Sequence, residues 1–178
     1  MNVLALDSST KRTGYAFFKE DQLQYGAIAS ASTNVERRIG VMRDEIIKII
    51  KENDIDIVVM EEVRPDGYNN RTGKVLHWLQ GCIVVAIFEF NPKIKVEFIG
   101  SSSWRSVIGI QGYRIKRDQQ KQKDIEYANK TYNLELKPSQ DDEADAIGIL
   151  AAYRQNNNIV ELKPKTKLNP IGSDESAF

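Results

Sequence analysis

The sequence is poor in the residues that build thiol or imidazole sites, and it carries no excess of charge. Cys82 is the only cysteine and His77 the only histidine. A single thiol forms no intramolecular disulfide and offers no cluster for zinc or iron–sulfur. Apolar residues follow Cys82, so we interpret it as a small core residue and expect a reducing cytoplasm. The 25 basic and 25 acidic residues balance, so total charge gives no argument for nucleic acid, and only the placement of charges can.

Long hydrophobic runs are also lacking. We find no apolar run near the roughly 20 residues that a membrane helix needs, and residues 1–6 are too short a run for a signal peptide. The sequence therefore predicts no membrane association. A chain of 178 residues, 41% of them apolar, is typical of one globular domain. We expect this domain at residues 1–155 and a polar tail at 156–178, where periodicity disappears.

Hydrophobic patterning predicts an α/β domain with a mixed, five-stranded central sheet flanked by helices. The expected strands are residues 3–6, 13–18, 23–30, 55–60 and 94–99. The expected helices are about 34–52, 74–90, 116–132 and 139–154, with a short helix capped by residues 101–103. Leu76, Leu79, Ile83 and Ala86 lie at helical spacing, and this apolar helix is expected to serve both the core and a dimer interface.

Acidic residues occur where strands and a helix are otherwise apolar. Asp7 ends the first strand, and Glu61 ends the strand after the first helix. Asp142 and Asp145 are three apart, so they project from one helical face. Functional groups gather at the carboxyl ends of parallel strands, so we expect the four carboxylates to converge. Their mutual repulsion calls for a cation, and oxygen ligands suit Mg²⁺ or Mn²⁺. Two such ions about 4 Å apart can activate water and stabilise the leaving oxygen of a phosphodiester.

Each acid also has a simpler interpretation. Asp7 can form an Asx turn, and Glu61 can be an ordinary charge at a strand end. Asp142 fits a capping box that begins at Ser139, where negative charge favours a helix N-terminus. Asp145 is harder to explain in this way, because it lies beyond the first turn on an apolar segment where an unpaired acid is costly.

With these residues identified, the sequence resembles the RuvC family of Holliday-junction resolvases. Residues 4–15, Leu-Ala-Leu-Asp-Ser-Ser-Thr-Lys-Arg-Thr-Gly-Tyr, match the family's opening strand, acid and Thr-Gly-Tyr turn. Residues 59–63, Val-Met-Glu-Glu-Val, resemble its second acidic strand, and residues 142–147, Asp-Glu-Ala-Asp-Ala-Ile, its final helix. The resemblance covers about residues 2–152. Cellular members usually have Pro-Gly where this chain has Ser8–Ser9, so the match favours the phage and viral branch.

The resemblance implies an RNase H-like fold and a homodimer that cuts two opposed strands of a four-way junction with Mg²⁺ or Mn²⁺, two ions per active site. It assigns the metal-ligand and catalytic roles to Asp7, Glu61, Asp142 and Asp145, with Glu62 and Asp141 as the nearest rivals for two of the places. Cellular members place an aromatic DNA contact where this chain has Arg64, so stacking would fall to Tyr68.

Basic residues cluster around the proposed site, and phosphate neutralisation dominates DNA affinity. The predicted DNA-binding residues are Arg64, Tyr68, Arg71, Lys74, Arg105, Arg114, Lys116, Arg117 and Lys121. A solvated charged helix remains an alternative for residues 116–123.

Three other functions remain open. A fork or flap nuclease would use the same chemistry. A non-catalytic nucleic-acid-binding module would not need the intact acids. An ATP-binding domain of the actin and sugar-kinase type starts similarly, but it places Gly two residues after the Asp, where this chain has Ser9.

Overall fold

The computed structural model describes residues 1–63 and 71–159 and contains one mixed sheet between two layers of helices. In chain order the elements are β1 (Val3–Asp7), β2 (Arg12–Lys19), β3 (Gln22–Ala29), α1 (Val35–Glu52), β4 (Ile57–Glu61), α2 (Arg71–Phe90), β5 (Lys95–Ile99), α3 (Ser101–Val107), α4 (Arg117–Tyr132), the 3₁₀ turn η2 (Pro138–Gln140) and α5 (Asp141–Asn156). The strand order is β3-β2-β1-β4-β5. β1 pairs antiparallel with β2 and parallel with β4, so the predicted mixed, five-stranded sheet is confirmed.

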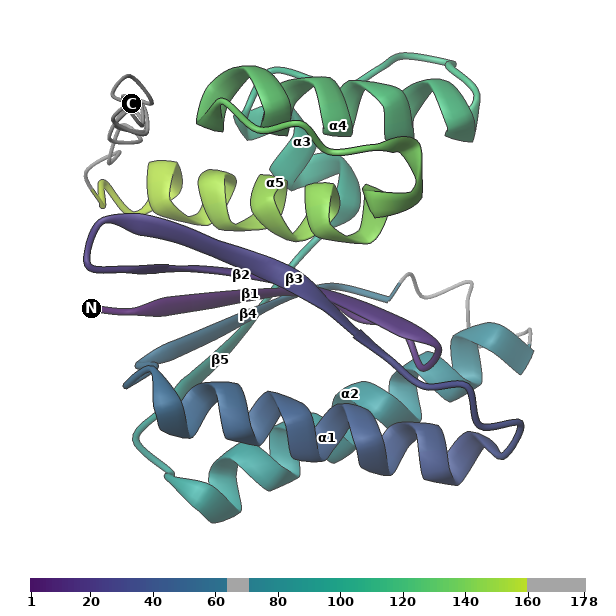
Figure 1. Ribbon diagram of the computed structural model, residues 1–178, viewed down its shortest axis with the longest axis vertical. Coiled ribbons are helices and arrows are strands. Elements are labelled where there is room, and N and C mark those ends of the chain that lie inside the picture. The colour runs from purple at the N-terminus through teal and green to yellow at the C-terminus, as the bar shows by residue number, and fades with distance from the viewer. Residues whose placement is uncertain (64–70, 160–178) are drawn as a thin grey trace, which may run out of the picture.

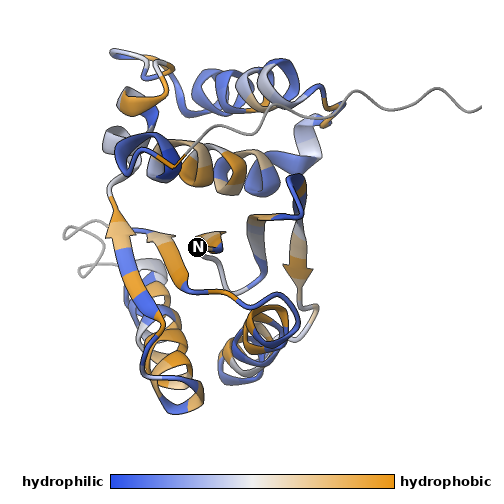
Figure 2. Cartoon of the chain, turned by 90° about the vertical axis from the view of Figure 1, so that its left-hand side faces the viewer, coloured by the Kyte–Doolittle hydropathy of each residue, from blue (hydrophilic) through white to orange (hydrophobic). Residues whose placement is uncertain are grey.

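The central strands are buried on both faces. In Figure 1, α3, α4 and α5 cover one face of the sheet, and α1 and α2 cover the other. Val3 and Ala5 of β1 pack on the α5 side, whereas Leu4 and Leu6 pack on the α1 side. Figure 2 shows hydrophobic residues in the strands and in the helices that face them. Burial on both faces explains why β1 and β4 appear in the sequence as continuous apolar runs.

The expected elements are present, with small shifts at their ends. Asn34, at the expected start of the helix, caps α1 by accepting a hydrogen bond from the Arg37 amide at 2.7 Å. Two cap predictions were wrong. Gly100 is the N-cap of α3, and the three serines lie inside its first turn. At α5, Ser139 lies in η2 and Gln140 is the N-cap. Helix α3 begins directly after β5, one residue earlier than expected, so the serines are already helical. At α5 a 3₁₀ turn takes up residues 138–140, so the α-helix begins after the expected capping serine.

Helix α2 has a buried side and an exposed apolar side. Leu79, Ile83 and Ile87 are buried against the sheet and α1. Trp78 and Phe88 are 60% and 66% exposed, and both are large hydrophobic residues. Although the sequence analysis found no apolar run of membrane-spanning length, α2 is, by length and composition only, the one described helix that could cross a membrane, with 28% of its apolar window buried.

Candidate active site

The sheet brings Asp7 and Glu61 to neighbouring strand ends. β1 and β4 are parallel and in register through Leu6 and Met60, so the next residue of each strand is acidic. Side chains alternate between the two faces of a strand. Asp7 therefore lies on the same face as Val3 and Ala5, the face that α5 covers. The same alternation places Glu61 on that face.

Helix α5 supplies the other two carboxylates. Asp7 pairs in register with Gly14 of β2, and the backbone of Asp142 lies against Gly14. The first turn of α5 thus starts beside the end of β1. Asp7, Glu61, Asp142 and Asp145 all line one cleft of about 800 Å³. The structure therefore brings together the four acids that the sequence singled out.

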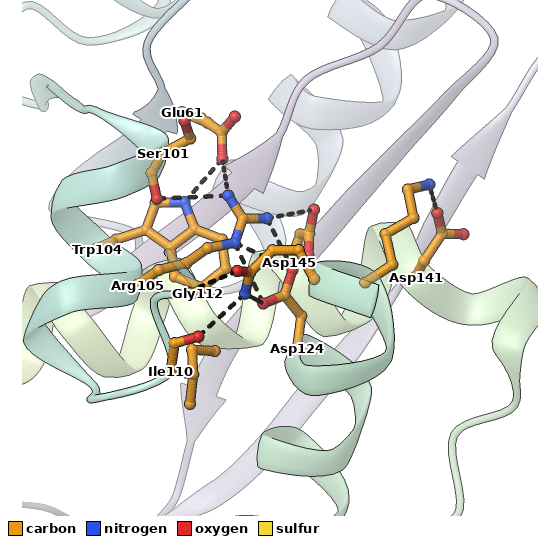
Figure 3. A network of polar contacts seen from close by, with 11 residues as sticks. Glu61, Ser101, Trp104, Arg105, Ile110, Gly112, Asp124, Asp141 and Asp145 are labelled. Carbon is orange, nitrogen blue, oxygen red and sulfur yellow. Dashed lines mark hydrogen bonds and ion pairs between the residues drawn. The ribbon is translucent and has the colours of Figure 1, made fainter. Parts of the chain in front are cut away.

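Arg105 of α3 lies among these acids (Figure 3). Its Nη2 donates to Asp145 Oδ2 at 3.2 Å and to Asp124 Oδ2 at 2.8 Å, and its Nη1 lies 3.9 Å from Glu61 Oε2. The guanidinium also stacks 4.0 Å from the Trp104 ring. We predicted Arg105 as a DNA-binding residue, but in the structure its charge is engaged by the site's own carboxylates.

Glu61 is held by hydrogen bonds at both its backbone and its side chain. Trp104 Nε1 donates to Glu61 Oε2 at 2.7 Å, and Gln80 Nε2 donates to the Glu61 carbonyl at 2.7 Å. Trp104 is fully buried, and its ring packs on Gly148 of α5. One indole therefore links α5 to the end of β4 and orients the Glu61 carboxylate.

Two further cations hold the start of α5. Arg12 of β2 lies 3.0 Å from Asp142 Oδ2 and also pairs with Glu143. Lys121 of α4 pairs with Asp141. Asp141, a rival for a ligand position, is thus engaged by a lysine, and Lys121 is a partner of α5 as well as a residue of the cleft.

Burial and mutual repulsion disfavour ionisation of these acids. Burial raises the pKa of Asp7 to about 7, and repulsion from Glu61 and Asp142 adds to the rise. Burial likewise raises the pKa of Asp145 to about 9, with repulsion from Asp7 and Asp124. The pKa of Asp142 is also raised by burial, although Arg12 opposes the shift. These acids therefore gain from a further positive charge in the cleft.

The donor set fits a hard divalent cation. All four acids offer oxygen, which Mg²⁺ and Mn²⁺ prefer, and the buried Oδ1 of Asp145 has no hydrogen-bond partner among the described residues. Within residues 1–63 and 71–159, however, no three acidic, histidine or cysteine side chains stand close enough to hold a metal ion. Coordination would require side-chain movement in the cleft.

The other predicted DNA-binding residues fall into three groups. Arg64 and Tyr68 lie outside the described residues. Arg71 and Lys74 are exposed in the first turns of α2. The last group is exposed and lies at the start of α4 and in the loop before it: Arg114, Lys116 and Arg117. The Arg114 guanidinium lies 5.1 Å from the Tyr113 ring, and Lys116 is the N-cap of α4. Arg117 lines the cleft.

Sequence reasoning missed Asp124. This residue of α4 is 1% exposed and accepts hydrogen bonds from Arg105 and Gln120. Asp124 lies one helical turn before Ala128 and directly before Ile125, both buried. An acid on the apolar face of an otherwise basic helix was the signal that could have revealed it.

The chain is similar in sequence to a family of phage proteins and to RuvC nucleases. A family model described as Lactococcus phage M3 protein matches residues 1–155. The crossover junction endodeoxyribonuclease RuvC of Dictyoglomus thermophilum is 29% identical over 162 residues, covering 86% of this chain and 96% of the relative. The RuvC of Fusobacterium nucleatum is 24% identical over 191 residues, covering 98% and 96%.

Solved structures show the same fold at low identity. Thermus thermophilus RuvC in complex with a Holliday junction substrate superposes with a TM-score of 0.69 at 16% identity, covering 93% of this chain and 100% of that one. Fowlpox virus resolvase, solved with Holliday junction DNA, gives a TM-score of 0.52 at 13% identity, covering 90% and 100%. The predicted RNase H-like fold is therefore confirmed.

Proposed function

The chain belongs to the family described as Lactococcus phage M3 protein and has RuvC resolvases as homologues, and from this premise we propose that it is a metal-dependent endonuclease that resolves four-way DNA junctions. The proposed reaction is symmetric incision of two opposed strands, leaving 5′-phosphate and 3′-hydroxyl ends. The convergence of Asp7, Glu61, Asp142 and Asp145 on one cleft carries the proposal. We place the reaction in the cytoplasm.

The four acids are the proposed metal ligands. Two Mg²⁺ or Mn²⁺ ions would supply an activated water and stabilise the leaving 3′ oxygen. Asp7 and Glu61, on neighbouring strands of a rigid sheet, would form the fixed side of the site. Asp142 and Asp145 would close it from α5, whose start is anchored by Arg12. Trp104 would keep the Glu61 carboxylate oriented toward the cleft.

The exposed basic residues would bind the DNA backbone. Arg117 lines the same cleft as the acids, and Arg71 and Lys74 begin the helix beside it. These side chains are exposed, in contrast to Arg105 and Lys121, which pair with acids. The proposal therefore assigns phosphate contacts first to Arg71, Lys74 and Arg117, and then to the other predicted DNA-binding residues: Arg64, Tyr68, Arg114 and Lys116.

A second copy of the chain is the proposed partner, because cutting both strands of a two-fold junction requires two symmetric sites. Trp78, Val85 and Phe88 are spaced on one side of α2 and are each more than half exposed. An exposed apolar patch of this kind marks an interaction site. We propose this side of α2 as the dimer interface.

Cleavage of synthetic substrates tests the function. Purified protein is incubated with a four-way junction, a fork and a duplex, in Mg²⁺, in Mn²⁺ and in EDTA. We expect paired nicks in the junction with either ion and none in EDTA. Asp145→Asn should abolish cutting while preserving junction binding, and Asp44→Asn, an exposed acid of α1, should cut normally. Junction cutting by a clean Asp145→Asn preparation would contradict the site, and fork cutting alone would favour the broader branched-DNA nuclease.

A further inference from the structure

A buried ion pair lies immediately behind the carboxylates of the cleft. The Asp124 side chain is fully buried, and the Arg105 side chain is 14% exposed. Arg105 Nε and Nη2 both donate to Asp124 Oδ2, at 3.1 and 2.8 Å, and Gln120 Nε2 donates to Asp124 Oδ1 at 2.8 Å. The backbone carbonyl of Ser101 accepts a further hydrogen bond from Arg105 Nη1 at 3.4 Å. The guanidinium is therefore anchored from two elements: α4 through Asp124, and α3 through the Ser101 carbonyl and the Trp104 ring.

The same guanidinium also faces two of the proposed metal ligands (Figure 3). Its terminal nitrogens lie 3.2 Å from Asp145 Oδ2 and 3.9 Å from Glu61 Oε2. A divalent cation bound by Glu61 and Asp145 would use carboxylate oxygens that now face a positive charge. The guanidinium and the cation must therefore compete for them.

We propose that Arg105 is a built-in cation, a fixed positive charge at the active site, and that Asp124 holds it in place. Both are therefore positioning residues. Arg105 keeps Glu61 and Asp145 in place before a divalent ion binds, and it raises the ion concentration needed to fill the site. Asp124 acts through Arg105, by fixing the guanidinium and neutralising part of its charge. The inference rests on the proposed function, because it takes Glu61 and Asp145 as metal ligands.

The proposal predicts opposite effects for the two partners. Arg105→Gln removes the competing charge, so the site should fill at a lower Mn²⁺ concentration, by roughly five-fold or more, the usual size of a coupling between sites. Asp124→Asn removes a negative charge and leaves Arg105 to pair with Glu61 and Asp145 alone, so more Mn²⁺ should be needed. A merely structural pair would weaken Mn²⁺ binding in both variants, because both would loosen the site.

The experiment is a Mn²⁺ titration of the purified full chain without DNA, followed by melting temperature and by calorimetry. Arg43→Gln is the matched control, because Arg43 pairs with Asp44 on the exposed surface of α1 and has the same change in charge. It should leave the Mn²⁺ midpoint unchanged. Arg105→Gln strands a buried carboxylate and can fail to fold. The double variant Arg105→Gln/Asp124→Asn leaves no stranded charge and is then compared with Asp124→Asn, against which it should need less Mn²⁺.

The outcomes separate this inference from the proposed function. If the unmodified protein responds to neither Mn²⁺ nor Mg²⁺, the metal site and the proposed function both fail. If it responds, but loss of Arg105 leaves the midpoint unchanged or raises it, the built-in cation is overturned and the nuclease proposal stands.

Discussion

The backbone of Asp142 lies so close to Gly14 that a side chain at Gly14 has no room. A Cβ added there would come within 2.0 Å of the Asp142 carbonyl oxygen. Gly14 is also the register partner of Asp7. This contact therefore sets the distance between Asp7 of β1 and Asp142 of α5, and the glycine is required by close approach rather than by backbone conformation.

Gly14→Ala should lower both stability and cleavage. The first turn of α5 must move away from β2, which should cost about 1–3 kcal/mol as overpacking and separate Asp142 from Asp7. Urea unfolding and junction cleavage measure the two effects. Gly40→Ala in α1 is the control, since an added Cβ there meets nothing within 4 Å. Unchanged cleavage in Gly14→Ala would show that the close approach does not matter.

Trp104→Phe should slow cleavage without weakening junction binding. The change removes the indole donor to Glu61, and loss of a hydrogen bond to a charged group should reduce the free energy of unfolding by about 2 kcal/mol. Single-turnover cleavage and urea unfolding provide the measurements. Trp78→Phe, at a 60% exposed position, should be nearly neutral in the same unfolding assay. A Trp104→Phe protein that cleaves at the normal rate would remove the indole from the mechanism.

Stability without divalent ions should fall as pH rises. The pKa values of Asp7 and Asp145 are raised to about 7 and about 9 in the folded protein, against about 3.9 for an unfolded aspartate. The folded state therefore binds more protons than the unfolded state. The contribution of these two acids to the free energy of unfolding is complete below about pH 4 and is lost as pH rises toward 9. Melting curves in EDTA should show the decline, and Mn²⁺ should reverse it. Asp145→Asn should flatten the profile, whereas Asp44→Asn should follow the unmodified protein.

Arg117→Ala should weaken junction binding and lower its salt dependence. Loss of one phosphate contact should reduce the slope of log affinity against log salt by about 1. Binding to an uncut junction in EDTA at several salt concentrations measures the slope. Lys48→Ala is the control, because Lys48 lies on α1 across the sheet from α4. Equal slopes for Arg117→Ala and the unmodified protein would exclude Arg117 from the interface.

Trp78→Glu combined with Phe88→Glu should convert the proposed dimer to a monomer. Two charges placed on an apolar interface are costly to bury. Light scattering after size-exclusion chromatography measures the mass. Val41→Glu, an exposed apolar position on α1, should leave the dimer intact. Monomeric unmodified protein that still makes paired nicks would contradict the dimer proposal.

The sequence pattern predicted correctly those features that depend on residues close together along the chain. β1 and β4 were predictable because strands buried on both faces need continuous apolar residues. Asp7 and Glu61 stood out because an acid at the end of such a strand is unusual. The extent of α1, expected at about residues 34–52, was also predictable. The caps of α3 and α5 were not, because α3 starts directly after β5 and a 3₁₀ turn precedes α5, which shifts each start from the expected serine.

The pairing of charges was not predictable in the same way. Arg105 and Lys121 were predicted as DNA-binding residues, and the acids that pair with them could not be predicted, because sequence shows charge and not the partner that engages it. Asp124 was overlooked for the same reason, since its partner Arg105 lies 19 residues away in another helix. Sequence alone determined which acids this protein has, and the periodicity that puts each on a strand end or one helical face. Only tertiary packing decided that they meet. The contact of α5 with Gly14 and the ion pairs of Arg105 with Glu61 and Asp145 join residues that are far apart along the chain.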